Sequence, residues 1–481
     1  MIFAVVLFAN SAANFVFGVV LSALLGPAEF GRYATVALAA LTIGVAAFEW
    51  LRSSSLRFSG DVEGRQRIAA SLEVGYLIAM ALLYLAIGAA VLCGFNFGLP
   101  PALLALTPLL AVALTRVDFA GAQFRARDEP RAFATLYGLR QVLSFFFVVA
   151  VAYYTRDSTM TVATFAACSL IAAIALSSAL RTPGARLRQA SRRSLGQFLV
   201  YAKPIVASVV IYQLISLINR QVALDRLGAV ATGELSLATD LGQRVFLVVN
   251  SVPELLLFQY ALQRDRAEGR GAAERQIGVN MVLILALLAP LTAGYMAMAP
   301  TFEALLVPSA YRGEYARLTL ELAPGFLVFC LISSGLSPVF QLARRTWPVT
   351  VGALAALAAD FVLLQFGGAA ASVDTLARAY SISLGVGFVV TAALALRQAS
   401  VRPQIRDIAI IVAATLAMAF AIRPLNGLGS RSIAAALAVV CGGGLYGAVL
   451  LAFDVAGLRG WAAEWLRAPR GAWMAALRPR S

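Results

Sequence analysis

Charged side chains occur inside long apolar stretches of this sequence, where they could bind ions or charged ligands. Asp240 and Arg244 lie four positions apart within the stretch 233–262, so they share one face of a helix. At about 100° per residue, Glu254 falls near the same stripe. Because a charge inside a membrane span is costly, this face predicts a wet cavity. An Asp240–Arg244 pair that only satisfies itself inside a helix bundle is the alternative.

The preceding stretch, 199–225, carries a second polar face that could line the same cavity. Its members are Gln213, Ser216 and Arg220. An arginine guanidinium binds phosphate oxygens through a bidentate fork and stays charged at any working pH. We therefore expect Arg220 and Arg244 to make the cavity partly cationic and to bind substrate, together with Gln213 and Ser216.

Further charged residues in other apolar stretches extend both sets of candidates. The additional substrate-binding candidates are Arg52 and Arg116. The chain has no histidine, so proton coupling needs a carboxyl group, which takes up a proton more readily in a low-dielectric site. The candidate ion-coupling residues are Asp240, Glu49, Asp360 and Glu254.

Some intramembrane charges have simpler interpretations. Arg116 and Asp118 are about 200° apart around a helix, so we expect no pair between them. Charged side chains near the predicted cytoplasmic ends of spans can reach the interface by snorkelling. The residues in that position are Arg52, Glu73, Arg140 and Lys203.

The sequence predicts no cofactor and no metal. Its four cysteines are scattered singly, without a C-x-x-C pair, so neither zinc nor a redox pair is indicated. The only lysine, Lys203, lies outside any G-x-x-x-x-G-K motif. ATP is therefore not expected to be the direct energy source.

The elements that must position these residues are membrane spans. The 481 residues are 60% hydrophobic and 13% charged, against roughly 25% charged residues in soluble proteins. Continuous apolar runs of about 18 or more residues predict transmembrane helices, and not barrel strands. We predict an all-α polytopic membrane protein with about fourteen spans. These are 2–25, 33–56, 68–93, 101–122, 133–153, 160–180, 199–225, 233–262, 277–300, 316–343, 348–367, 375–396, 407–422 and 432–453.

The net charge of +15 is explained by orientation in a membrane, without nucleic acid. Counted over alternate predicted loops, one side carries 25 arginines and the other 6. Cytoplasmic loops are enriched in arginine and lysine, so both termini are predicted to be cytoplasmic. The tail, 454–481, interleaves tryptophan with arginine, which suits either an interfacial helix on anionic lipid or a disordered basic segment.

Two short glycine-containing segments predict an internal repeat. LLGPAEFGRYA (24–34) and RLGAVATGELS (226–236) each lie between two apolar runs, and Gly26 and Gly31 precede Gly228 and Gly233 by 202 residues. Read as tight loops on the non-cytoplasmic side, they align two sets of six spans in parallel. The repeat predicts lobes at 1–198 and 199–400, two additional helices at 401–453 and a substrate site between the lobes.

The stretches NFVFGVVLSALLGPAEFGRYATVALAAL (14–41) and LINRQVALDRLGAVATGELSLATDLGQRV (217–245) resemble bacterial Wzx-type polysaccharide flippases of the multidrug/oligosaccharidyl-lipid/polysaccharide exporter superfamily. This chain has Asn219-Arg220 where that family commonly has Asp-Arg. The resemblance implies a MATE-like fold in the bacterial inner membrane. It also implies an undecaprenyl-diphosphate-linked oligosaccharide substrate, coupling to H⁺ or Na⁺, and a polymerase or chain-length regulator as candidate partner.

Three other function classes stay open at this point. A drug or small-cation exporter on the same fold should show an anionic cavity, whereas these spans offer arginines. A membrane polymerase or glycosyltransferase needs catalytic groups in a sizeable loop, and the predicted non-cytoplasmic loops are all short. A purely structural membrane protein gains nothing from buried charges. We therefore expect a transporter and not an enzyme.

Overall fold

A computed structural model describes residues 2–58, 65–93, 98–180, 186–343, 345, 347–366, 372–398 and 403–460. All secondary-structure elements in this part of the chain are helices. The N-terminal half contains α1 (Ile2–Phe58), α2 (Arg65–Leu92), α3 (Pro101–Ala126), α4 (Pro130–Leu143), α5 (Val149–Thr155), α6 (Ser158–Ala175) and α7 (Ser177–Leu180). A π-helical turn, Ser144–Val148, joins α4 to α5 into one continuous rod.

The C-terminal half and the two additional spans follow the same pattern. They contain α8 (Arg192–Arg226), α9 (Ala229–Glu268), α10 (Arg270–Ala297), α11 (Ala299–Leu306), α12 (Glu314–Cys330), α13 (Ser337–Leu342), α14 (Trp347–Phe366), α15 (Val373–Gln398), α16 (Ile405–Ile422), α17 (Arg431–Leu437) and α18 (Gly443–Ala452). π-helical turns also join α12 to α13 and α17 to α18.

The predicted fold class is confirmed. Thirteen helices of the described part are long and apolar enough to cross a membrane. One of them, α1, consists of two helices merged across Gly26, so counting its parts separately gives the fourteen predicted spans. The lobe boundaries at 198 and 400 stay predictions. The interfacial helix in the tail also stays a prediction, because residues 461–481 lie outside the described part.

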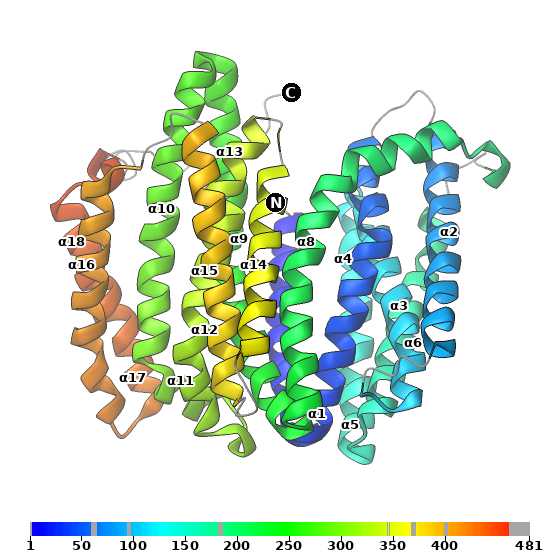
Figure 1. The fold of residues 1–481 in the computed structure, drawn as a ribbon, viewed down its shortest axis with the longest axis horizontal. Helices are drawn as coiled ribbons and strands as arrows, with labels where there is room; N and C mark the ends of the chain where they lie inside the picture. The colour runs from blue at the N-terminus through cyan, green and yellow to red at the C-terminus, as the bar shows by residue number, and fades with distance from the viewer. Residues whose placement is uncertain are drawn as a thin grey trace.

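The helices form two groups that meet at α1 (Figure 1). The two parts of α1 form a V at the centre, and α8 runs beside it from over α2 toward the tip of the V. Helices α9 to α15 lie on the other side, and α16 packs on α10 at the far edge. Helices α16 to α18 therefore lie at the edge of the group formed by α9 to α15.

The predicted loops 26–32 and 226–232 are wrong in length, because each shrinks to a break at one glycine. Gly26 has φ 72° and ψ 172°, and Gly228 has φ 87° and ψ 176°. Glycine adopts this positive φ without steric cost. In the first break, Pro27 then occupies the first helical position, where its missing N–H costs nothing. The two breaks thus share one backbone conformation, which supports the internal repeat.

The two breaks also pack against each other. A Cβ atom added at Gly31 would overlap the carbonyl oxygen of Ala229, and one added at Gly233 would overlap the carbonyl oxygen of Pro27. Both pairs, Pro27 with Ala229 and Gly31 with Gly233, are 202 residues apart. A contact in which equivalent residues exchange roles is the signature of a two-fold relationship. The two halves are therefore in close contact at this end of the molecule, hereafter the Gly26 end.

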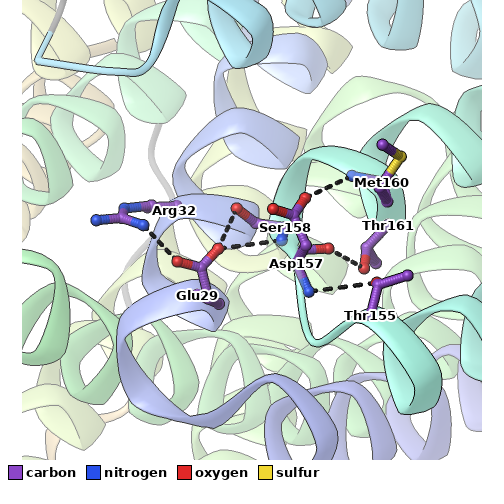
Figure 2. A network of polar contacts seen from close by, with 7 residues as sticks. All are labelled: Glu29, Arg32, Thr155, Asp157, Ser158, Met160 and Thr161. Atoms are coloured by element: carbon purple, nitrogen blue, oxygen red, sulfur yellow. Dashed lines mark hydrogen bonds and ion pairs between the residues drawn. The ribbon is translucent and has the colours of Figure 1, made fainter.

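A polar network connects the start of the second part of α1 to α6 (Figure 2). The Glu29 carboxylate accepts hydrogen bonds from the Ser158 main-chain N–H at 3.0 Å and from the Ser158 hydroxyl at 2.6 Å, and it pairs with Arg32. Asp157, beside them, caps α6 by accepting from the Met160 N–H at 2.8 Å. The Glu29 carboxylate therefore connects α1 to α6 within the N-terminal half.

Candidate functional site

Arg220 and Asp240 form an ion pair where α8, α9 and α1 meet. The Arg220 side chain is 3% exposed and the Asp240 side chain 28%. Arg220 also donates from Nη1 to the Ala34 carbonyl oxygen of α1 at 3.1 Å. The guanidinium therefore bridges the two halves of the molecule, and its charge is matched by a carboxylate.

Arg244 lies one turn further along α9 and contacts the other part of α1. Its Nη1 donates to the Asn14 carbonyl oxygen, and the absence of a side chain at Gly18 leaves room for the guanidinium. The self-contained Asp240–Arg244 pair considered from the sequence is wrong, because Asp240 binds Arg220 instead. Among the described residues, Arg244 has no carboxylate partner.

Asp360 is a buried carboxylate without a cationic partner in the described part of the chain. Both of its oxygens accept from the Asn219 side-chain amide, at 2.9 and 3.0 Å. The Asn219 side-chain oxygen is buried and has no hydrogen-bond partner among the described residues. Helices α8 and α14 therefore meet at a buried acid that no arginine or lysine of the described residues neutralises.

The two remaining arginine candidates are paired with acids in the N-terminal half. Arg52 binds Glu49 on the same helix through two hydrogen bonds of 2.6 Å. Arg116 on α3 reaches Glu73 on α2 at 3.0 Å. Their positive charges, and the negative charge of the ion-coupling candidate Glu49, are thus balanced locally.

Asp118 and Arg140 make contacts that the sequence did not suggest. The Tyr137 hydroxyl donates to Asp118 at 3.3 Å, so Arg116 and Asp118 have separate partners, as expected. Arg140 was predicted to snorkel, but it is 8% exposed and donates to the Asn10 side chain at 3.2 Å. Its depth follows from the helix start at Pro130, ten residues before it, which places it about 15 Å along the helix.

The other candidates on α8 and α9 are less informative. Gln213 and Ser216 are half-buried on α8, and the Gln213 side-chain oxygen is buried without a partner. Glu254 lies in α9, but its side chain is outside the described part of the structure. No cluster of three or more potential metal ligands occurs in the described residues.

Electrostatic interactions connect these groups across the molecule. The charges of Arg52 and Arg140 act on Asp118, and those of Arg140, Arg244 and Asp240 act on the Tyr33 hydroxyl. The charges of Arg220, Asp240 and Asp360 act on Tyr380. Of the predicted site residues, Arg220, Arg244, Asp240 and Asp360 therefore lie around Tyr33 and Tyr380, whereas Arg116 pairs separately with Glu73. Chemically, this group of residues can hold an anion at its arginines and a cation at Asp360.

No protein-family model and no curated protein sequence matches this chain. Its fold is similar to that of the lipid II flippase MurJ in an inward closed conformation. The TM-score is 0.74 at 12% identity, over 94% of this chain and 98% of that one. It is also similar to a multidrug resistance MATE family transporter of the MOP superfamily in an inward-facing conformation. There the TM-score is 0.58 at 14% identity, over 81% and 95%. The chain therefore has the polytopic fold that these two membrane proteins share.

Proposed function

We propose that this protein is a secondary-active flippase of the bacterial inner membrane. It moves an undecaprenyl-diphosphate-linked oligosaccharide, an O-antigen, capsule or exopolysaccharide repeat unit, from the cytoplasmic to the periplasmic leaflet. The observation that carries the proposal is Arg244, a cation deep in the membrane at the junction of the halves, without a carboxylate partner in the described residues. The similarity to a lipid II flippase over almost the whole chain supports the same class of substrate.

The mechanism follows from the contacts between the halves. With both termini cytoplasmic, the Gly26 end faces the periplasm, and there the halves are in contact. A lipid diphosphate enters from the cytoplasmic side and binds the guanidinium groups, while its prenyl chain stays in the lipid. Separation of the Gly26 end then exposes the glycan to the periplasm, as alternating access requires.

Coupling to an ion gradient is assigned to Asp360. A carboxylate without a counter-ion is costly in the membrane, and binding H⁺ or Na⁺ removes that cost. Asn219, which binds Asp360, directly precedes Arg220, which binds Asp240 and Ala34. Ion binding at Asp360 can therefore alter the Arg220 bridge between the halves through Asn219, the neighbouring residue of α8.

Translocation in liposomes tests the proposed function. Fluorescent prenyl-diphosphate oligosaccharide is placed in both leaflets, and an impermeant glycosidase is added outside. We expect wild type and Arg378→Gln, which lacks an arginine paired with Glu321 on the C-terminal half, to render the inner half digestible, and Arg244→Ala to fail. Wild-type protein that moves no glycolipid under proton or sodium gradients, but moves small cations, would favour the drug-exporter alternative.

A further inference from the structure

Residues 186–203, hereafter the α8 start, carry positive charge that no acid in the described part of the chain neutralises. The segment contains five basic residues and no acid. All five are exposed and none forms an ion pair with a described residue. They are Arg186, Arg188, Arg192, Arg193 and Lys203. At the same end of the molecule, where α9 meets α10, Arg264 and Arg270 instead pair with acids four residues later. The α8 start is therefore open to an anionic partner from outside the chain.

Contacts with two other helices fix the α8 start at one end of the bundle. The Ser191 N–H donates to the Ser71 hydroxyl, near the beginning of α2, at 2.9 Å. The Ser54 hydroxyl, near the end of α1, donates to the Phe198 carbonyl oxygen at 3.4 Å. The Phe198 ring is buried, with its centre 5.5 Å from that of the Phe58 ring. The first turns of α8 therefore cross the end of α2 before the helix turns down beside α1 (Figure 1).

The inward and outward faces of the α8 start differ in composition. Positions 191, 195, 198 and 202 share one stripe of the helix, and their side chains are buried or half-buried. The neighbouring stripe is exposed and contains Arg192, Leu199 and Lys203. Leu199 is 50% exposed, and Val200 beside it is 77% exposed. Basic and apolar side chains together on an exposed face are typical of a helix that lies at the boundary between lipid headgroups and acyl chains.

We propose that the α8 start is a docking surface for anionic phospholipids of the cytoplasmic leaflet. The arginine count of the loops predicts that this end of the bundle is cytoplasmic, and arginine and lysine side chains are attracted to the negative surface of that leaflet. A lipid surface also accounts for Leu199 and Val200, whose exposure an acidic protein or a nucleic acid would leave unexplained. The proposal is independent of what the protein transports, because this surface lies apart from the junction of α1, α8 and α9.

The position of the surface along the chain gives lipid binding a structural consequence. The α8 start connects α7, in the N-terminal half, to the rest of α8, which carries Arg220. Lipid bound there therefore holds the connection between the halves at the membrane surface.

Lipid quenching of a site-specific fluorophore tests the surface in the full-length protein. Bimane is attached at Val200→Cys, in a background without the native cysteines. The protein is placed in phosphatidylcholine nanodiscs that contain either brominated phosphatidylglycerol or brominated phosphatidylcholine. The preference is the ratio of the mole fractions of the two brominated lipids that give equal quenching. We expect phosphatidylglycerol to be preferred about 10-fold, since each basic residue near an anionic surface contributes roughly 5-fold.

Variants and a second label position serve as controls. Arg192→Gln/Lys203→Gln should lose most of the preference. Arg378→Gln, which removes an exposed arginine paired with Glu321, should keep it. Bimane at Leu85→Cys, a position of α2 that is 70% exposed and distant from the α8 start in the chain and along the helix, should be quenched equally by the two lipids.

Each outcome decides for or against the surface. Equal quenching by the two lipids at Val200→Cys, or quenching by neither, overturns the proposal, as does an unchanged preference in Arg192→Gln/Lys203→Gln. If that variant does not fold, each single substitution decides in the same way, with a preference about 3- to 5-fold lower. Geranylgeranyl diphosphate is then added at the mole fraction of the brominated phosphatidylglycerol. Unchanged quenching supports a phospholipid surface, whereas loss of quenching would show that the α8 start binds lipid diphosphates instead.

Discussion

Gly31 and Gly233 stack against each other at the Gly26 end, and each approaches the main chain of the other half so closely that no side chain fits between them. The contact is reciprocal: Gly31 meets Ala229, while Gly233 meets Pro27, and Gly31 and Pro27 precede Gly233 and Ala229 by 202 residues. Two helices that touch through main-chain atoms form a flat, tight contact that side chains cannot adjust. In alternating access this contact has to open and close completely.

A methyl group at this contact should therefore force the Gly26 end apart. Overpacking of a tight contact costs about 1–3 kcal/mol, and a free-energy change of that size shifts a two-state population about 5- to 150-fold. We expect Gly233→Ala to favour the conformation that is open at the Gly26 end. Spin labels at Thr155→Cys and Ser309→Cys, both exposed, in a background without the native cysteines would report a longer distance by pulsed electron paramagnetic resonance.

The control for this experiment is Gly88→Ala, since a Cβ atom there meets nothing within 4 Å. It should leave the distance distribution unchanged. An unchanged distribution in Gly233→Ala, with the protein folded, would show that the glycine contact does not determine which end is closed.

Neutralising Asp360 should leave glycolipid movement intact but remove its dependence on an ion gradient. Asp360→Asn keeps the shape of the side chain and one of the two oxygens that accept from Asn219, but it removes the acidic group. We expect glycolipid exchange to persist without acceleration by a proton or sodium gradient, measured with the glycosidase assay in liposomes with imposed gradients. Asp407→Asn, at a buried acid of α16 that accepts from the Ala456 N–H at 2.9 Å, should retain the gradient dependence. Full gradient dependence in Asp360→Asn would exclude Asp360 as the coupling group.

Replacing Arg220 should destabilise the protein, and replacing its partner Asp240 as well should restore part of the lost stability. Arg220→Gln leaves Asp240 without its cation; removal of one partner of a fully buried pair costs about 3–5 kcal/mol. Because Asp240 keeps 28% exposure, we expect about 1–3 kcal/mol here. Thermal unfolding in detergent of Arg220→Gln, Asp240→Asn and the double variant forms a double-mutant cycle. Strictly additive losses would contradict a direct pair.

The sequence predicted the spans well because span length and apolarity are local properties. The apolar run at 101–122 and the helix Pro101–Ala126 agree, as do the other predicted spans. The sequence did not predict which charged side chains contact each other, since these contacts depend on how the helices rotate and pack. Asp240 faces Arg244 on a helix diagram, but α8 brings Arg220 closer. The burial of Arg140 arises from contacts of α4 with α1, more than a hundred residues away in the chain.

The Glu29 network in Figure 2 gives a final test, because replacing each member of its ion pair should destabilise the protein by a different amount. Glu29 accepts two hydrogen bonds from Ser158 in addition to pairing with Arg32, whose side chain is 40% exposed. Glu29→Ala leaves the Ser158 N–H and hydroxyl without their acceptor, and we expect a loss of about 1–2 kcal/mol. Arg32→Ala removes only an exposed partner, which contributes about 0–1 kcal/mol. Thermal unfolding in detergent compares the two variants, and equal losses would mean that the ion pair, and not the contact with α6, stabilises this end of α1.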